Sequence, residues 1–113
     1  MIMARADEKL TEKVVNVTRI QRTPDYERNY ERNRSAEYTC ECCGRKLNPK
    51  TMKQVQMLTS AEWTDEQKEV DTNTHEEMEA NGQGFFYVGP DCYREIMKQI
   101  RTSGETHRVL VIE

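Results

Sequence analysis

The sequence predicts a single α+β domain in which strands precede and follow one well-defined helix. Segments rich in Val, Ile, Thr and aromatic residues predict the strands, and an apolar stripe at helical spacing near the C-terminus predicts the helix. A chain of 113 residues without an internal shift in composition fits one domain, 1–113. Because only 35% of the residues are hydrophobic and 33% are charged, the core must be small and needs support from a metal, a disulfide or a partner.

The first part of the chain predicts a strand followed by a short helix. Residues 1–11 are polar, and we expect them to be disordered. KVVNVTRI, residues 13–20, has the β-branched composition of a strand. This strand ends before Pro24, because the residue preceding a proline avoids helical angles. The tandem sequence YERNYERN, residues 26–33, suits a helix on which the two tyrosines lie one above the other.

The second part predicts two strands, a helix and a final strand. Alternation in 53–60 indicates a strand, and GFFYVG, 84–89, indicates another. The stretch 61–83 between them predicts either a short helix with a loop or an acidic loop throughout. PDCYREIMKQIR, 90–101, carries the helical stripe and begins with a proline suited to a first turn. THRVLVIE, 106–113, is a continuous apolar run that predicts a strand buried on both faces or pairing centrally.

Four cysteines form the chemically most informative pattern. Cys40 and Cys43 have C-x-x-C spacing, and Gly44 follows directly, so the chain can turn there with positive φ and aim backbone amides at the thiolates. Cys92 falls in the first turn of the predicted 90–101 helix, where the helix dipole and free amides stabilise a thiolate. Thiolates are preferred ligands of Zn²⁺. The pattern therefore predicts a zinc site made by these three cysteines.

The cysteine motifs resemble a known zinc-binding arrangement. The C-x-x-C-G unit of residues 40–44 is of the type called a zinc knuckle, and we refer to it as the knuckle. A knuckle, a β-hairpin and a helix that donates a sulfur from its first turn resemble the treble-clef group of zinc fingers. In particular, CCGRKL together with GFFYVGPDC is similar to small zinc-binding proteins of bacteriophages and prophages that have no agreed biochemical role. The resemblance covers roughly residues 40–98, the expected zinc-binding core, and it implies the fold and a bound Zn²⁺.

The fourth ligand is left open by the sequence. A standard treble clef takes two ligands from the helix start, and the second would stand at Gly89 here. His75 and Cys42 are the leading candidates, followed by Asp91 and then His107, and a water would leave an open position. The main rival to a metal is a redox dithiol, but the βαβ pattern that surrounds such motifs in thioredoxin-like proteins is absent from the sequence.

Charge is distributed unevenly along the chain, which suggests two kinds of partner. Positive charges slightly outnumber negative ones up to Lys50, whereas the segment 62–79 is strongly acidic. An acidic surface would meet a basic protein partner. The alternative is nucleic acid, bound through aromatic and basic residues near the knuckle. These residues are Tyr26, Arg28, Tyr30, Arg32, Arg34, Arg45 and Lys46.

Several functional classes are not favoured. The two histidines lack a recognisable catalytic context, and NGQG is too short for a phosphate loop, so we expect no enzymatic activity and no small-molecule substrate. No apolar run reaches the roughly 20 residues of a membrane helix, and the N-terminal residues lack the apolar core of a secretory signal. The sequence therefore predicts a cytoplasmic interaction module of the phage or prophage accessory type that binds a protein partner.

Overall fold

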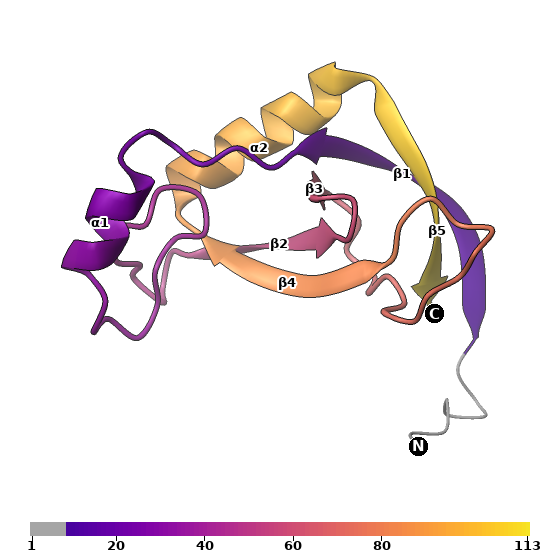
Figure 1. Ribbon diagram of the computed structural model, residues 1–113, viewed down its shortest axis with the longest axis horizontal. Coiled ribbons are helices and arrows are strands. Elements are labelled where there is room, and N and C mark those ends of the chain that lie inside the picture. Colours follow the sequence, from indigo (N-terminus) through magenta and orange to yellow (C-terminus); the bar gives the residue numbers. More distant parts are fainter. Residues whose placement is uncertain (1–8) are drawn as a thin grey trace.

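The computed structural model describes residues 9–113 and shows one five-stranded antiparallel sheet with two helices, which confirms the predicted α+β class (Figure 1). The elements in chain order are β1 (Leu10–Arg19), α1 (Tyr26–Arg32), β2 (Lys53–Leu58), β3 (Glu62–Thr64), β4 (Gly82–Val88), α2 (Pro90–Ser103) and β5 (Glu105–Ile112). The predicted disorder of residues 1–11 falls, for 1–8, outside the described residues. Leu10 and Thr11 belong to β1, where they pair with Ile112 and Val111.

The sheet has the strand order β4-β2-β3-β1-β5, so the apolar C-terminal strand lies at one end of it and not at its centre. The prediction of a strand buried on both faces or pairing centrally is therefore wrong: only Val109 and Val111 of β5 are buried, on one face, while a loop covers the outer edge of the strand. The amide of Ile112 donates to the carbonyl of Glu69 at 2.8 Å, and that of Asp71 donates to the carbonyl of Leu110 at 2.8 Å. The loop thus protects an edge strand that would otherwise present unpaired backbone groups.

The stretch predicted as a short helix or a loop contains the three-residue strand β3, which was not predicted. A tight turn at Ala61, whose φ is +61°, joins β2 to β3. Trp63 and Thr64 are each only 1% exposed, since they lie between β2 and β1 in the sheet. The remainder of the stretch forms a loop up to β4, with no helix.

The core consists of two clusters of buried side chains. The first lies between strands β1, β2 and β5 and the loop after β3, and comprises Val15, Val17, Leu58, Val70, Ala80, Val109 and Val111. The second lies where α2 packs against β1, β2 and β3, and comprises Cys40, Leu47, Val55, Trp63, Val88, Ile96 and Ile100. Because Cys40 is a member of the second cluster, the cysteine knuckle is part of the helix-facing core.

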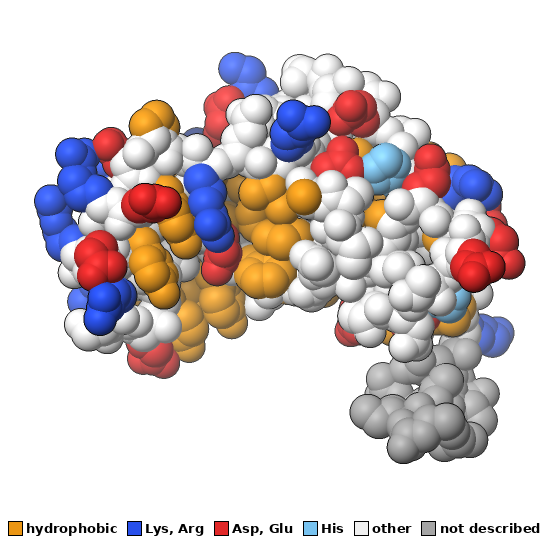
Figure 2. All heavy atoms as spheres, viewed as in Figure 1, with side chains coloured by type: hydrophobic (Ala, Val, Ile, Leu, Met, Phe, Trp, Pro, Cys, Tyr) orange, Lys and Arg blue, Asp and Glu red, His pale blue; other side chains and the backbone are white. Residues whose placement is uncertain are grey.

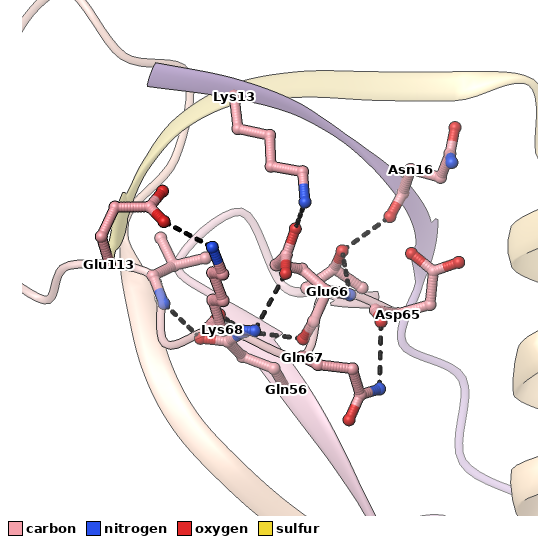
Figure 3. Close-up of polar contacts among 10 residues, drawn as sticks. Lys13, Asn16, Gln56, Asp65, Glu66, Gln67, Lys68 and Glu113 are labelled. Carbon is pink, nitrogen blue, oxygen red and sulfur yellow. Dashed lines mark hydrogen bonds and ion pairs between the residues drawn. The ribbon is translucent and has the colours of Figure 1, made fainter. Parts of the chain in front are cut away.

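Gln56 on β2 organises the loop that follows β3 (Figure 3). Its side chain is 1% exposed, and its amide nitrogen donates to the carbonyls of Glu66 and Lys68 at 3.1 and 2.9 Å. Its amide oxygen accepts from the backbone N–H of Val70 at 2.6 Å. One buried side chain therefore satisfies three backbone groups of the loop and fixes its path. Lys13 adds an ion pair with Glu66.

Candidate metal centre

Three cysteine sulfurs from two distant segments meet at one point of the fold. The Sγ atoms of Cys40, Cys43 and Cys92 all lie within 4.8 Å of one another. Cys40 is buried, while the other two are half-buried. Cys40 and Cys43 come from the knuckle, and Cys92 comes from the first turn of α2. Three sulfurs in this arrangement could hold a metal ion.

The knuckle is a tight turn whose backbone amides point at sulfur. The amide of Gly44 donates to the carbonyl of Cys40 at 2.8 Å, and the amide of Cys40 donates to the carbonyl of Arg45 at 2.9 Å. The Sγ of Cys40 accepts from the amides of Cys42, Cys43 and Gly89, each at 3.4 Å. Amides directed at a sulfur stabilise its thiolate form. Gly89 therefore contributes to the site through its backbone amide instead of as a ligand.

Helix α1 packs closely on this turn and supports it. Gly44 has φ +77°, and a Cβ there would lie 2.5 Å from the carbonyl oxygen of Tyr26 and 2.8 Å from the nitrogen of Tyr30. The side-chain amide of Asn29 donates to the carbonyl of Cys43 at 2.9 Å. The amide of Thr23 donates to the carbonyl of Cys42 at 3.0 Å. The sequence did not predict this supporting role of Asn29, because the contact with Cys43 joins two segments that are distant along the chain.

The environment of the three thiols favours their protonated state. A hydrogen bond with Cys92 and burial raise the pKa of Cys40, although the three backbone amides oppose this. Burial raises the pKa of Cys43. The contact with Cys40 lowers the pKa of Cys92, but a hydrogen bond with Cys42 and burial outweigh it and raise that pKa to about 12. A metal that binds these sulfurs must therefore displace their protons, so its affinity falls as the solution becomes more acidic.

Cys42 lies beside the group without belonging to it. It shares a hydrogen bond with Cys92, which is the main cause of a lowered Cys42 pKa. Its Sγ also donates to the carbonyl of Gln21 at 3.4 Å. Cys42 is not among the sulfurs that all lie within 4.8 Å of one another.

The other candidates for a fourth ligand have different partners. His75 Nε2 lies 2.6 Å from Asp71 Oδ2, in the loop after β3, and the structure does not bring it to the cysteines. His107 Nε2 lies 2.5 Å from Glu62 Oε1. The carboxylate of Asp91 pairs with Arg94. Within residues 9–113, the potential metal-ligating group consists of the three cysteines alone.

The residues proposed for nucleic-acid binding lie on α1, in the turn that follows it and on the knuckle, and several of them already pair with carboxylates or with one another. Arg28 pairs with Asp25, and Arg34 pairs with Glu31, both at 2.7 Å. The rings of Tyr26 and Tyr30 are stacked with centroids 5.8 Å apart. Figure 2 shows the result: basic and acidic side chains are interleaved at the end of the molecule that contains α1. Arg32, Arg45 and Lys46 are exposed.

Comparison with known protein families, curated proteins and solved structures finds no match to this chain. Among residues 9–113, neither helix has the length and apolar character needed to cross a membrane.

Proposed function

We propose that Cys40, Cys43 and Cys92 bind one structural Zn²⁺. The observation that carries this proposal is the convergence within 4.8 Å of three sulfurs that come from the knuckle and from the start of α2. Zinc is favoured among metals because it is redox-inert, accepts tetrahedral geometry and prefers thiolate ligands. The ion would tie the knuckle to α2 and stabilise the second core cluster, to which Cys40 belongs.

The proposed fold of this region is a treble-clef-like arrangement. The knuckle is followed by β2 and β4, which pair as antiparallel strands, and then by α2 with Cys92 in its first turn. This order supports the proposal. The chain departs from a simple hairpin because β3 and a long loop are inserted between β2 and β4. On the resemblance of its motifs, we further propose an accessory protein of the phage or prophage type.

Metal content and chelation test the zinc proposal. We expect one Zn²⁺ per purified, untagged chain by mass spectrometry, and a strong chelator should unfold or loosen the domain because metal binding supplies folding free energy. Cys43→Ser and Cys92→Ser should each lower the zinc content and the melting temperature. Cys42→Ser is the matched control, because it removes a neighbouring sulfur outside the group. Full zinc content in both Cys43→Ser and Cys92→Ser would contradict the proposal.

We propose that the chain acts as an interaction module whose acidic loop binds a basic surface of a partner protein. The side chain of Gln56 binds backbone groups of Glu66, Lys68 and Val70, so the first part of this loop is tied to β2. Four exposed carboxylates of the loop pair with no cation within residues 9–113. They belong to Asp65, Glu69, Glu76 and Glu77. Unpaired charges of one sign favour association with the opposite sign.

Capture from a lysate treated with nuclease tests this role. We expect a protein to be retained by the wild-type chain and lost when the four loop carboxylates are changed to Asn or Gln. The control is a variant that neutralises four exposed carboxylates elsewhere, at Glu12, Glu27, Glu37 and Glu105. Equal retention by both variants would contradict the assignment to the loop.

Nucleic acid is the second candidate, favoured by Arg45 and Lys46, which form no ion pair among residues 9–113. Binding through these residues should weaken steeply with rising salt. Loss of all captured material after nuclease treatment would support this candidate over a protein partner.

A further inference from the structure

A cavity of about 480 Å³ opens directly onto the cysteine group. Cys43 and Cys92 border it, together with residues from the start of α1, the knuckle and the start of α2. Cys40 is buried on the core side of the group and does not border the cavity. Cys42 borders a different cavity, shared with Trp63 and Ile96. A metal held by the three sulfurs would therefore be approached from the larger cavity, which Cys43 and Cys92 border and Cys42 does not.

The charges around this cavity favour an anionic occupant. Two of its acidic residues are already paired, Asp25 with Arg28 and Asp91 with Arg94. Arg45 and Lys46, which also border the cavity, pair with no carboxylate within the part of the chain that is described. Within residues 9–113, the cavity is therefore bordered by two basic residues that have no carboxylate partner.

The start of α2 can also donate hydrogen bonds into the cavity. The first turn of this 14-residue helix lines the cavity, and the amides of a first turn have no partner within their own helix. Together with Arg45 and Lys46, these amides suit an oxygen-rich anion bound near the metal.

We propose that this cavity binds a small anionic molecule whose donor atom takes the fourth coordination position of the metal. Arg45 and Lys46 hold the anionic group, and the donor atom reaches the metal between Cys43 and Cys92. Coordination uses a lone pair of the donor and involves no oxidation or reduction; a thiol donor releases its proton to solvent. This inference rests on the proposed metal site. It means that the three cysteines hold the metal permanently, while the ligand at the fourth position can exchange.

The test uses the full chain loaded with Co²⁺, whose visible and near-ultraviolet absorption reports the number of bound sulfurs. Mercaptoacetate and 2-mercaptoethanol serve as probes, since both offer a thiol and only the first carries a carboxylate. We expect mercaptoacetate to intensify the sulfur-to-cobalt band with 1:1 saturation, and to bind more tightly than 2-mercaptoethanol. Arg45→Ala combined with Lys46→Ala should weaken mercaptoacetate binding about tenfold, with little effect on 2-mercaptoethanol.

Two controls make the outcome specific. Lys98→Ala combined with Arg101→Ala removes the same charge from exposed sites on α2 that do not border this cavity, and should leave both affinities unchanged. Cys42→Ser should keep the response to mercaptoacetate. A one-to-one Co²⁺ complex that responds to neither thiol would overturn this inference and leave the metal site standing. Equal affinity for both thiols would also overturn it. Failure to bind Co²⁺ stoichiometrically would overturn the metal site itself.

Discussion

The knuckle requires glycine at position 44 for two reasons. The backbone needs a positive φ to close the knuckle, and α1 needs to approach so closely that a Cβ would meet the backbone of Tyr26 and Tyr30. Glycine alone meets both requirements, because it has no Cβ that could clash with its own backbone at positive φ or with the backbone of α1. The residue therefore couples the geometry of the cysteines to the position of the first helix.

We predict that Gly44→Ala lowers the free energy of unfolding by about 3 kcal/mol or more, through backbone strain together with displacement of α1. Gly104→Ala is the matched control, because Gly104 has a similar φ of +70° with no atom within 4 Å of the added Cβ. It should cost only about 1–2 kcal/mol, the strain of the left-handed conformation. Urea denaturation measures both values, and equal losses would show that α1 does not pack on the knuckle.

Asn29 and Asn33 occupy the same place in the two copies of YERN but make different contacts. Asn29 binds the carbonyl of Cys43, whereas Asn33 donates its side-chain amide to the carbonyl of Asn29 at 2.8 Å, at the end of α1. We predict that Asn29→Ala speeds the loss of zinc to a chelator several-fold, because the partly buried carbonyl of Cys43 loses its donor and the knuckle loosens. Asn33→Ala should leave this rate nearly unchanged. A chelation time course on both variants decides the point.

At the scale of elements, the loop after β3 depends on one side chain of β2. We predict that Gln56→Leu lowers the free energy of unfolding by about 2–4 kcal/mol, since it leaves two carbonyls and one amide of the loop without a partner. It should also speed hydrogen exchange at the Val70 amide. Gln54→Leu, at an exposed position of the same strand, is the control. A small and equal effect of both changes would show that the loop is held by other contacts.

The ion pair between Lys13 and Glu66 joins the same loop to β1 and gives it a pH dependence. Burial raises the pKa of Glu66, but the pair with Lys13 and the amides of Lys68 and Gln67 outweigh it and hold that pKa below its usual 4.5. A depressed folded-state pKa contributes stability that is present above the usual value and lost as the pH falls through the folded value. We predict that Glu66→Gln flattens the acid side of the stability profile. An equal flattening in Glu76→Gln, an exposed position of this loop, would contradict this.

Local patterns predicted β1, β2, β4 and α2, because β-branched and aromatic residues mark the strands and the apolar stripe of α2 buries Ile96 and Ile100. Burial does not follow the alternation in 53–60, since the neighbouring residues Val55 and Gln56 are both buried. β3 was missed since three residues carry too little periodicity, and its burial comes from neighbours on β1 and β2. The edge position of β5 was not predictable from its apolar run, because the cover over its outer edge comes from a loop. The existence of β3 and the place of β5 in the sheet therefore depend on contacts between residues that are distant along the chain.

At the scale of the whole molecule, spacing predicted the grouping of Cys40, Cys43 and Cys92, because a C-x-x-C turn and a helix start are local structures. The local sequence could not show whether His75 lies near these cysteines, because its position depends on contacts with distant residues. Gln56 and β5 hold the loop of His75 against the other end of the sheet, where its imidazole meets Asp71. The group of three sulfurs then depends on how the knuckle, β4 and α2 are packed together.

The most direct test of this arrangement is X-ray absorption at the zinc edge of the purified chain. The proposed site predicts one zinc per chain with at least three sulfur neighbours at about 2.3 Å. In Cys92→Ser, the sulfur shell should lose a neighbour or the metal should be lost. A coordination shell made only of nitrogen and oxygen, or a spectrum unchanged in Cys92→Ser, would contradict a metal ion that joins the knuckle to α2.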